Sequence, residues 1–533
     1  AADYPCMTDR RPPPERPTMP TDRPNPIRTP GSAAYLIGIG GCGMSGLAEM
    51  LRARGLSVAG SDHARSEVTD RLTRLGVPVS FDQEAGELPE RADVVVASAA
   101  IKADHPELVA AVERGVWTVS YAEALGACMA DHTGVAVAGT HGKSTTVAML
   151  GAALIEAGLD PTVIVGASVP DLAGAGEPAT GFRLGAGSIP SGERAGGPGL
   201  LLAEACEFNR SFHHLRPALA AITSVEADHL DVYGSLDAVV RAFAEFAALL
   251  PSGSDGGTLL IAHEGAHRRE IAAATAADVE TVGFTPSADW CVEFDPTPRR
   301  VMLHRAGERV CDFTLRAPGA HMAVDAAFAA ALAIRLGADP LTVARGLERF
   351  RGVDRRMQLL ARAALPGVPA GAPTVAVYDD YGHHPTEVDA TLRALRDAER
   401  PQDRGGKLVC VFQPHQHSRT RFLLDEFADA FSHADAVIVP HIYFVRDSEA
   451  ERTRVSAADL VDRLRDRGVR AMHLYPFGAI VEQLENLVKP GDVLVAMGAG
   501  PVWQVARGFL DSLARGAPAA TSRDPSNPEH RSL

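Results

Sequence analysis

Residues 135–150 read V-A-V-A-G-T-H-G-K-S-T-T-V-A-M-L. The four apolar residues at the start carry no charge, which predicts a strand covered on both faces. Gly139 and Gly142 then let the backbone turn its N–H groups inward, where bulkier residues would obstruct them. Thr145 and Thr146 begin a predicted helix whose N-terminus favours anions. The stretch therefore predicts a strand, a phosphate-binding turn and a helix in direct succession.

Two side chains of this turn suit a nucleotide. Lys143 supplies a positive charge for the β- and γ-phosphate oxygens, and Ser144 supplies a hydroxyl for Mg²⁺. The common pattern G-x-x-x-x-G-K-[ST] is not met in full, because Val137 stands where its first glycine should be and the loop is two residues tighter. A plain glycine turn with a chance lysine is the alternative.

Length and composition limit the possible functions. Single cores stop growing at about 250–300 residues, so a chain of 533 residues should form about two to four domains. Its net charge of −15 argues against nucleic acid or an anionic membrane surface as the main partner. Seven scattered cysteines without a C-x-x-C pair favour a reducing compartment and no structural zinc. Since no apolar run approaches the ~18 residues of a spanning helix and no signal peptide is visible, a cytoplasmic location is expected.

Short β-rich runs alternate with amphipathic helices, which predicts an α/β protein with parallel sheets. The Pro- and Arg-rich start and the polar end cannot bury a core, so a disordered leader and a flexible tail are expected. Residues 171–198 are dense in Gly, Pro, Ala and Ser and predict a long mobile loop. The expected segments are a leader over 1–32, domains over 33–131, 132–352 and 353–516, and a tail over 517–533.

A second glycine loop opens the first domain. Gly38, Gly40 and Gly43 satisfy G-x-G-x-x-G between a predicted strand and a predicted helix, and Asp62 follows the next strand. Taken alone, the pattern indicates a dinucleotide such as NAD. The glycines only bring a diphosphate to a helix N-terminus, however, so a UDP group satisfies them equally. A purely structural turn is the third possibility.

Carboxylates follow another apolar strand of the second domain. Glu204 and Glu207 stand three residues apart at its end, where they can hold Mg²⁺ against phosphates. His229 follows in V-E-A-D-H-L-D, either as a metal ligand or as a shielded structural histidine. Its spacing alone favours the structural role.

Polar residues end two consecutive predicted strands of the third domain. Y-D-D-Y-G-H-H-P-T-E-V (378–388) follows the first strand and F-Q-P-H-Q-H-S-R-T (412–420) follows the next. An open α/β sheet binds its ligand at the carboxyl ends of its strands. One such stretch could be a chance polar loop, but two on consecutive strands predict a binding site.

Motifs in all three domains resemble the Mur ligase family. They are G-I-G-G-C-G-M-S-G-L-A in the first domain, G-T-H-G-K-S-T-T in the second, and D-D-Y-G-H-H-P-T-E and F-Q-P-H-x-x-S-R-T in the third, and the resemblance covers about residues 33–510. It implies a Rossmann-like UDP-sugar-binding domain, a central P-loop-type ATPase domain and a C-terminal Rossmann-like domain that binds an amino acid.

The resemblance, carried over motif by motif, implies four groups of site residues. The ATP group is Gly139, Thr140, His141, Gly142, Lys143, Ser144, Thr145, His321 and Arg355. The UDP-sugar group is Gly38, Gly40, Gly41, Gly43, Met44, Ser45, Asp62 and Ser98. The amino-acid group is Tyr381, His383, His415 and Arg419. The metal group is Ser144, Glu204 and His229, and the catalytic residues are Lys143, Glu204, His229 and Arg355.

The chain departs from the family pattern at several of these motifs. Cys206 interrupts the usual E-A-D-E, Met322 and Asp325 replace the asparagines of G-x-H-N-x-x-N after His321, and Gln416 replaces an arginine often found there. At the second domain boundary, R-G-V-D-R-R-M-Q (351–358) is similar to the family's G-V-x-R-R linker, which implies an arginine that reaches phosphate on domain closure. A pair of surface charges is the alternative there.

The activity implied is an ATP-dependent carboxylate–amine ligase of peptidoglycan precursor synthesis that uses ATP and Mg²⁺. ATP would convert the lactyl carboxylate of UDP-N-acetylmuramate to an acyl phosphate, which the amine of L-alanine would attack, leaving ADP and phosphate. A ligase for a recycled peptide shares nearly every motif. An NAD-dependent oxidoreductase would use only the first glycine loop, and a nucleic-acid motor would use only Lys143. A monomer or homodimer without membrane insertion is expected.

Overall fold

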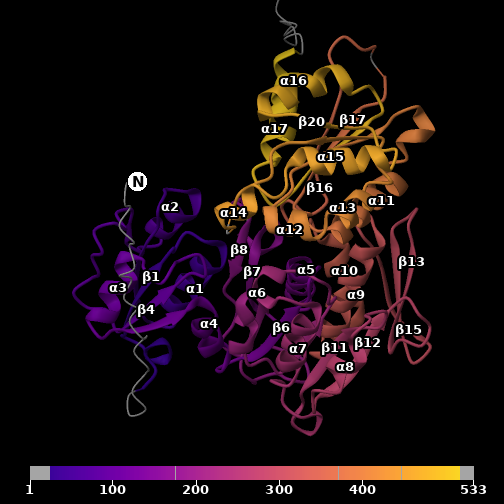
Figure 1. Cartoon of the computed structure of the whole chain (residues 1–533). Helices are drawn as coiled ribbons and strands as arrows, with labels where there is room; N and C mark the ends of the chain where they lie inside the picture. Colours follow the sequence, from indigo (N-terminus) through magenta and orange to yellow (C-terminus); the bar gives the residue numbers. More distant parts are fainter. Residues whose placement is uncertain (1–23, 175, 370, 446, 517–533) are drawn as a thin grey trace, which may run out of the picture. The chain divides into compact units, whose positions relative to one another are not determined.

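The computed structural model describes residues 24–516 except 175, 370 and 446. The chain forms two compact units, one ending at Asp354 and one beginning at Arg355. Figure 1 shows the elements of each unit, coloured along the sequence. The first 23 residues of the predicted leader and the whole predicted tail, 517–533, lie outside the described residues.

The first unit begins with a parallel five-stranded sheet. Its strands are β1 (Ala33–Ile37), β2 (Ser57–Ser61), β3 (Val79–Ser80), β4 (Val94–Ala97) and β5 (Trp117–Ser120), and its helices are α1 (Cys42–Ala53), α2 (Glu67–Arg74), α3 (Pro106–Glu113) and α4 (Tyr121–Met129). The strand order is β3-β2-β1-β4-β5. Because β1 lies between β2 and β4, the strand order reverses at its carboxyl end, where the glycine loop starts.

The rest of the first unit is built on a ten-stranded mixed sheet. Its strands are β6 (Thr133–Ala138), β7 (Thr162–Val169), β8 (Thr180–Arg183), β9 (Leu200–Glu204), β10 (Leu219–Ile222), β11 (Thr258–Ala262), β12 (Asp278–Gly283), β13 (Trp290–Asp295), β14 (Arg300–Arg305) and β15 (Glu308–Thr314). The order is β15-β14-β13-β12-β11-β10-β6-β9-β7-β8. Since β6 pairs in parallel with β9 and β10, the residues that follow these three strands meet at one edge.

Helices cover this sheet. They are α5 (Lys143–Glu156), α6 (Leu230–Tyr233), α7 (Leu236–Ala247), α8 (Arg268–Ala272), α9 (Ala320–Arg335) and α10 (Pro340–Arg349), with the 3-10 helices η2 (Pro170–Leu172), η3 (Phe208–His214) and η4 (Gly253–Asp255). Helix α5, which follows the phosphate turn, packs against both α9 and α10 and is buried over most of its length. A helix held in this way fixes the position of the turn at its N-terminus.

The packed chain begins earlier than the sequence pattern predicts. Residues 24–32 belong to the predicted leader, yet they include η1 (Pro26–Arg28), whose first turn is capped by the side chain of Asn25. Ile27 is fully buried in the core of the first unit. Arg28 also forms an ion pair with Asp131 after α4. One apolar side chain and these polar contacts order this part of the leader, which its composition alone does not reveal.

The segment 171–198, predicted as a long mobile loop, contains a strand. β8 pairs antiparallel with β7 and forms the edge of the sheet, and α1 of the first sheet packs on both strands. A Cβ atom on Gly46 of α1 would lie 3.0 Å from the Cβ of Phe182 on β8. Arg71 also donates to the Thr180 hydroxyl at 2.7 Å. The segment therefore joins the two sheets of this unit, which corrects the prediction for its described residues.

The second unit has a six-stranded sheet in the order β16-β17-β21-β18-β19-β20, in which only β16 is antiparallel to its neighbour. The strands are β16 (Gln358–Ala363), β17 (Val375–Asp380), β18 (Leu408–Phe412), β19 (Ala436–Val439), β20 (Ala471–His473) and β21 (Val493–Met497). The helices are α11 (Pro385–Glu399), η5 (Pro401–Arg404), α12 (His417–Phe422), α13 (Leu424–Asp429), α14 (Glu449–Arg452), α15 (Ala457–Asp466), α16 (Phe477–Leu487) and α17 (Trp503–Gly516). The carboxyl ends of β17 and β18 thus lie on either side of β21.

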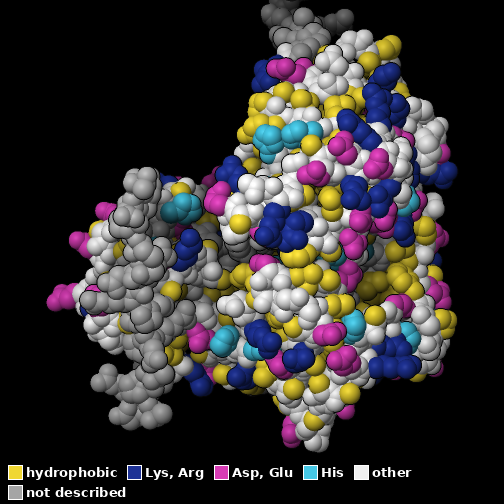
Figure 2. Space-filling model, in the orientation of Figure 1, with side chains coloured by type: hydrophobic (Ala, Val, Ile, Leu, Met, Phe, Trp, Pro, Cys, Tyr) yellow, Lys and Arg dark blue, Asp and Glu magenta, His cyan; other side chains and the backbone are white. Residues whose placement is uncertain are grey.

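The predicted α/β class is confirmed, although the antiparallel strands β13–β15 were not anticipated. Figure 2 shows basic and acidic side chains interspersed over the visible face of the described residues. In the described part of the chain, no helix combines the length and the apolar character that crossing a bilayer requires.

Candidate active site

The turn between β6 and α5 depends on its two glycines. Gly139 has a φ of 145° and Gly142 a φ of 81°, both in the region that favours glycine. A Cβ atom would lie 2.1 Å from Thr223 Oγ1 at Gly139 and 2.3 Å from Asp325 Oδ1 at Gly142. Conformation and space therefore both exclude a side chain at these positions, and the backbone of the turn can approach a phosphate closely.

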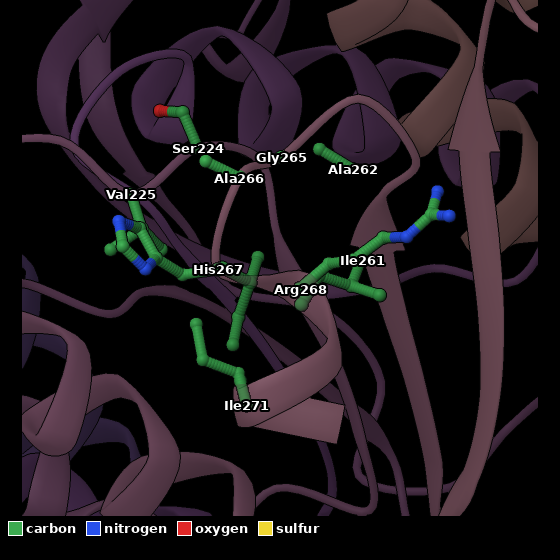
Figure 3. Close-up of a pocket in the computed structure, with 10 residues that line it drawn as sticks. Ser224, Val225, Ile261, Ala262, Gly265, Ala266, His267, Arg268 and Ile271 are labelled. Atoms are coloured by element: carbon green, nitrogen blue, oxygen red, sulfur yellow. The ribbon is translucent and has the colours of Figure 1, made fainter. Parts of the chain in front are cut away.

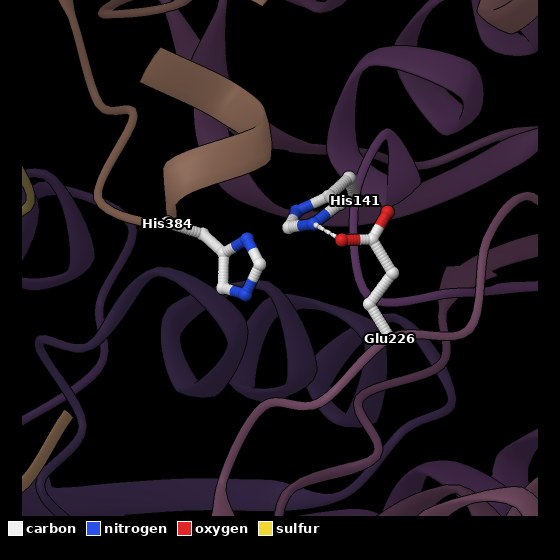
Figure 4. A group of neighbouring side chains, drawn as sticks. All are labelled: His141, Glu226 and His384. Carbon is white, nitrogen blue, oxygen red and sulfur yellow. Dashed lines mark ion pairs between the residues drawn. The ribbon is translucent and has the colours of Figure 1, made fainter. Parts of the chain in front are cut away.

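The chain that follows β10 holds this loop in place. Thr140 N donates to Ser224 O at 3.0 Å, and His141 N donates to Ser224 Oγ at 2.9 Å. Glu226 N donates to Thr140 Oγ1 at 2.9 Å. Figure 4 shows the ion pair between His141 Nε2 and Glu226 Oε2, which lie 3.5 Å apart. Ser224 and Glu226 were not predicted as site residues, because their role depends on pairing between strands distant in sequence.

Lys143 lies within this turn. Its ammonium donates to Gly139 O at 2.6 Å, to Thr140 O at 3.2 Å and to Glu207 Oε1 at 3.1 Å. Burial opposes the charge, but the carboxylates of Glu207 and Glu204 outweigh it and raise the pKa of Lys143 above its ordinary value. The site therefore holds a permanent cation on the phosphate loop.

Glu204 ends β9 beside the first residues of α5. Its Oε2 accepts a hydrogen bond from Ser144 Oγ at 2.9 Å and one from Gly166 N at 3.0 Å. Two of the three predicted metal ligands are therefore in direct contact. Glu207 is nearly fully buried and pairs with Lys143 at 3.0 Å, which gives it the role of counter-ion that the sequence left open.

His229, the third predicted metal ligand, reaches the same cluster through Glu207. Its Nε2 lies 3.9 Å from Glu207 Oε1 and 3.8 Å from Asp228 Oδ2. Its backbone has a φ of 51°, an unfavourable conformation for a residue with a side chain that is often retained at functional sites. The serine hydroxyl and the carboxylate are oxygen donors of the kind that Mg²⁺ prefers, whereas an imidazole is a less usual ligand for it.

In the first sheet, Asp62 closes the other glycine loop. Its Oδ2 accepts from Gly40 N at 2.8 Å, and its Oδ1 lies 2.9 Å from His63 Nδ1. A Cβ atom on Gly43 would lie 2.8 Å from the Tyr121 ring and hydroxyl, so the third glycine of the motif makes room for Tyr121. The loop is thus shaped by contacts from β2 and α4.

The other predicted UDP-sugar residues separate into two groups. Gly38 has a φ of 78° and a Cβ atom on it would lie 3.1 Å from the Cβ of Ser98, so both line the loop. Gly41 is the N-cap residue of α1. Met44 is instead buried in the core, and Ser45 Oγ donates to a backbone carbonyl of its own helix turn at 3.0 Å. The Met44 side chain thus belongs to the packing of α1, and a contact of this residue with UDP stays a prediction.

The start of α9 lies against the phosphate loop on another side. The carboxylate of Asp325 is the group nearest to Gly142, since its Oδ1 would lie 2.3 Å from a Cβ atom added there. Met322, one turn earlier, is buried in the protein interior. His321 is partly buried at the first turn of the helix. Of the two positions where the family pattern has asparagine, only Asp325 therefore borders the loop.

A small pocket lies at the carboxyl ends of β10 and β11, next to Ser224 (Figure 3). It encloses about 210 Å³, including its opening to solvent. An apolar wall with a few polar groups is typical of small-molecule sites. Its lining residues are Ile222, Ser224, Val225, Ile261, Ala262, Gly265, Ala266, His267, Arg268 and Ile271.

In the second unit, Arg355 contacts the loop that follows β21 and the end of β17. Its guanidinium donates to Gly498 O at 2.6 Å and to Gly500 O at 3.0 Å, and its Nε lies 3.4 Å from Asp379 Oδ2. It also lies over the Tyr381 ring, 5.1 Å from the centroid. Its role toward phosphate stays a prediction.

The four predicted amino-acid residues come together at the ends of β17 and β18. The ring centroids of Tyr381 and His383 are 5.3 Å apart, and those of His383 and His415 are 5.7 Å apart. Arg419 is buried and its Nη1 lies 3.1 Å from His415 Nδ1. Tyr443 stacks on His415 at 5.8 Å and was not predicted, since it follows β19. The result is a row of rings with a guanidinium beside it.

Gln416 occupies the start of α12 next to this row. Its N–H donates to Tyr443 O at 3.1 Å, and its carbonyl accepts from the Thr420 hydroxyl at 2.7 Å. Its φ of 66° marks a constrained backbone. The residue that replaces an arginine of the family pattern therefore serves to join the two loops of the pocket through its backbone.

Comparisons with known proteins agree with this arrangement. Three family models match the chain in order: Mur ligase family, catalytic domain, over 34–133; Mur ligase middle domain, over 137–333; and Mur ligase, glutamate ligase domain, over 355–500. The UDP-N-acetylmuramate–L-alanine ligases of Kineococcus radiotolerans and Sorangium cellulosum are 39% and 37% identical to it, over 90% and 91% of this chain and 96% and 97% of theirs.

Solved structures show the same fold. The UDP-N-acetylmuramate-alanine ligase of Thermotoga maritima has a TM-score of 0.71 at 25% identity, covering 91% of this chain and 99% of that chain. A murein peptide ligase of Psychrobacter arcticus has a TM-score of 0.63 at 22% identity, with the same coverage of 91% and 99%. Matches of this extent to family models and relatives, across both units, show that the chain belongs to the Mur ligase family.

Proposed function

We infer that this chain is an ATP-dependent carboxylate–amine ligase that joins L-alanine to the lactyl carboxylate of UDP-N-acetylmuramate, forming ADP and phosphate in peptidoglycan precursor synthesis. The observation that carries this inference is the 39% identity to a ligase of that name over 90% of this chain and 96% of the relative. Similarity over nearly the whole of both chains includes every domain that the reaction needs.

The predicted residues have roles that their positions support. A carboxylate is a poor acyl donor, so ATP would first convert it to an acyl phosphate. During this step Lys143 would neutralise charge on the transferring phosphoryl group. Ser144, Glu204 and His229 would hold Mg²⁺, which supplies further neutralisation of phosphate charge when bound. Arg419 would pair with the carboxylate of the amino acid.

The geometry supports two smaller proposals. The base of ATP would occupy the pocket beside Ser224, because this pocket adjoins the phosphate loop and has mainly apolar walls. The first glycine loop would take the diphosphate of UDP. Asp62 supports this loop, since its carboxylate accepts a hydrogen bond from Gly40 N at 2.8 Å.

The remaining expectations stay proposals. The domain limits are 33–131, 132–352 and 353–516, the chain acts as a monomer or homodimer, and its location is cytoplasmic, where ATP and UDP-sugars are available.

Phosphate release from ATP in the presence of UDP-N-acetylmuramate tests the function. Release should depend on an amine substrate, with L-alanine the best of the free amino acids. More efficient use of a peptide such as L-Ala-γ-D-Glu-meso-diaminopimelate would instead identify a peptide-adding ligase. No release with any amine would contradict both.

A further inference from the structure

His383 and His415 lie side by side in the amino-acid pocket, and their hydrogen bonds assign them opposite tautomers. Arg419 Nη1 lies 3.1 Å from His415 Nδ1. A guanidinium can only donate, so His415 Nδ1 must accept and the ring proton is on Nε2. This contact also disfavours the charged form of His415, in which both nitrogens carry hydrogen. His415 is therefore a neutral donor.

His383 has the reverse arrangement. Its Nδ1 lies 3.1 Å from the carbonyl oxygen of Tyr381 and 3.4 Å from Glu387 Oε2. Both partners are acceptors, so Nδ1 carries a proton, and in the neutral ring the lone pair is on Nε2. Glu387 is itself held by the N–H groups of His383 at 2.8 Å and His384 at 3.1 Å. A carboxylate oriented behind an imidazole in this way stabilises the charged imidazolium that forms when Nε2 takes a proton.

The geometry points to His383 as the general base that deprotonates the ammonium of the amino-acid substrate, with Glu387 as its positioning residue. The inference rests on the proposed function, since an amine can attack an acyl phosphate only after it loses a proton. His415 donates from Nε2 to the substrate carboxylate beside Arg419. His383 thus serves the ammonium of the amino acid, and His415 serves its carboxylate.

The proton balance of the step is complete without another reactant. The ammonium gives one proton to His383 Nε2, and its nitrogen lone pair then forms the C–N bond at the acyl carbon. The bond between that carbon and the phosphate oxygen breaks, and the phosphate leaves with the electron pair. The nitrogen loses its second proton to the phosphate, and His383 returns its own to solvent.

Charged groups lie near His383 on several elements. Glu387 on α11 favours the charged ring, whereas Arg419 on α12 opposes it through His415. The ring of Tyr381 packs edge-on against the ring of His383. The guanidinium carbons of Arg355 and Arg356 lie 5.1 Å and 4.6 Å from the centroid of the Tyr381 ring. Only the neutral imidazole can act as a base, so ligation should be lost in acid, where the ring is protonated.

The test uses the full chain with UDP-N-acetylmuramate, ATP and Mg²⁺, and measures kcat and the KM for L-alanine from about pH 6 to about pH 9.5. His383→Gln should lower kcat by about 10²–10⁴-fold while changing KM little. Its remaining rate should rise with pH as the free amine becomes more abundant. Glu387→Gln, which keeps an acceptor for the helix N-terminus, should move the acidic limb of the profile to lower pH, because the charged ring loses its carboxylate.

His415→Asn is the matched control, because it alters the same pocket without removing the proposed base. It should raise the KM for alanine and keep the wild-type pH profile. Hydroxylamine, which is neutral near pH 7 and needs no base, should trap the acyl phosphate of His383→Gln as fast as that of the wild type. A His383→Gln variant with a wild-type profile, or one that loses activity through KM alone, would overturn the inference. If the wild type forms neither hydroxamate nor the alanine product, the proposed function itself fails.

Discussion

At the scale of single residues, the pairing of Lys143 with Glu207 couples activity to stability. Removing the lysine should lower ligation by at least about 10²–10³-fold, because a phosphoryl transition state loses its cation. Lys143→Ala also leaves the Glu207 carboxylate buried without a counter-ion, which should cost about 3–5 kcal/mol of unfolding free energy. Kinetics and denaturant unfolding of Lys143→Ala measure the two effects.

The double variant Lys143→Ala with Glu207→Gln separates them. It should recover most of the lost stability, since the buried charge is gone, and remain as inactive as the single variant. Recovery of activity in the double variant would show that Lys143 acts only as a structural counter-ion.

Arg419 offers a second prediction at this scale. Arg419→Ala should raise the KM for alanine at least about 10-fold and leave the KM for ATP nearly unchanged, because one charge-assisted pair with a carboxylate contributes about 1.5–3 kcal/mol. The neighbouring Arg421 is the control, since its guanidinium pairs with Glu451 outside the row of rings. Arg421→Ala should leave both constants near the wild-type values, and an equal effect of the two variants on the KM for alanine would remove Arg419 from the pocket.

At the scale of elements, the docking of α1 on β8 depends on a glycine. An added Cβ at Gly46 would lie 3.0 Å from Phe182 Cβ and 3.1 Å from Ile164 Cδ1. Gly46→Ala should therefore lower the unfolding free energy by about 1–3 kcal/mol through overpacking, although alanine is the better helix former. Gly478 in α16 has nothing within 4 Å of an added Cβ, so Gly478→Ala should leave stability unchanged or raise it by up to about 1 kcal/mol. Thermal or denaturant unfolding compares the pair, and a stabilising Gly46→Ala would show that α1 is free to shift.

At the scale of the whole molecule, the stability should depend on pH through Asp380. Burial raises its pKa to about 6, against the backbone N–H groups of Met357 and Gly382 and the charge of Arg356. Its pKa is thus higher in the folded chain than the ordinary value of about 3.9, so its stabilising contribution is complete below about pH 4 and is lost as pH rises through about 6. The loss should be about 2–3 kcal/mol.

Asp380→Asn should remove this component of the pH dependence while retaining one acceptor for the two N–H groups. Denaturant unfolding of the wild type and the variant at several pH values measures this pH-dependent part of the unfolding free energy. Parallel curves for the two proteins between about pH 4 and about pH 7 would show that Asp380 is ionised throughout, as an ordinary carboxylate would be.

Ligand-dependent melting tests the first glycine loop in the intact chain. A ligand present at about 100 times its Kd stabilises the folded state by about 2.7 kcal/mol, which raises the melting temperature measurably. UDP or UDP-N-acetylmuramate should raise it, and NADH should not, because the proposed reaction uses a UDP-sugar and transfers no hydride. A shift with NADH and none with UDP would favour the oxidoreductase alternative.

The sequence by itself determined the α/β class, the two glycine loops and the polar ends of β17 and β18. These features are local: an apolar run, a glycine turn and a helix start lie within about ten residues, so their meaning does not depend on the rest of the fold. The strand bounds of β18, Leu408–Phe412, follow the apolar run that ends at the F-Q-P-H motif.

The tertiary structure alone decided which residues serve these loops. Ser224 and Glu226 hold the phosphate loop, Glu207 neutralises Lys143, and Tyr443 completes the row of rings, each from a strand end far along the chain. The strand β8 and the buried Ile27 lie in segments whose Gly- and Pro-rich composition predicts no packing. Such contacts arise from the order of strands in a sheet, which local patterns do not encode, and so they could be read only from the folded chain.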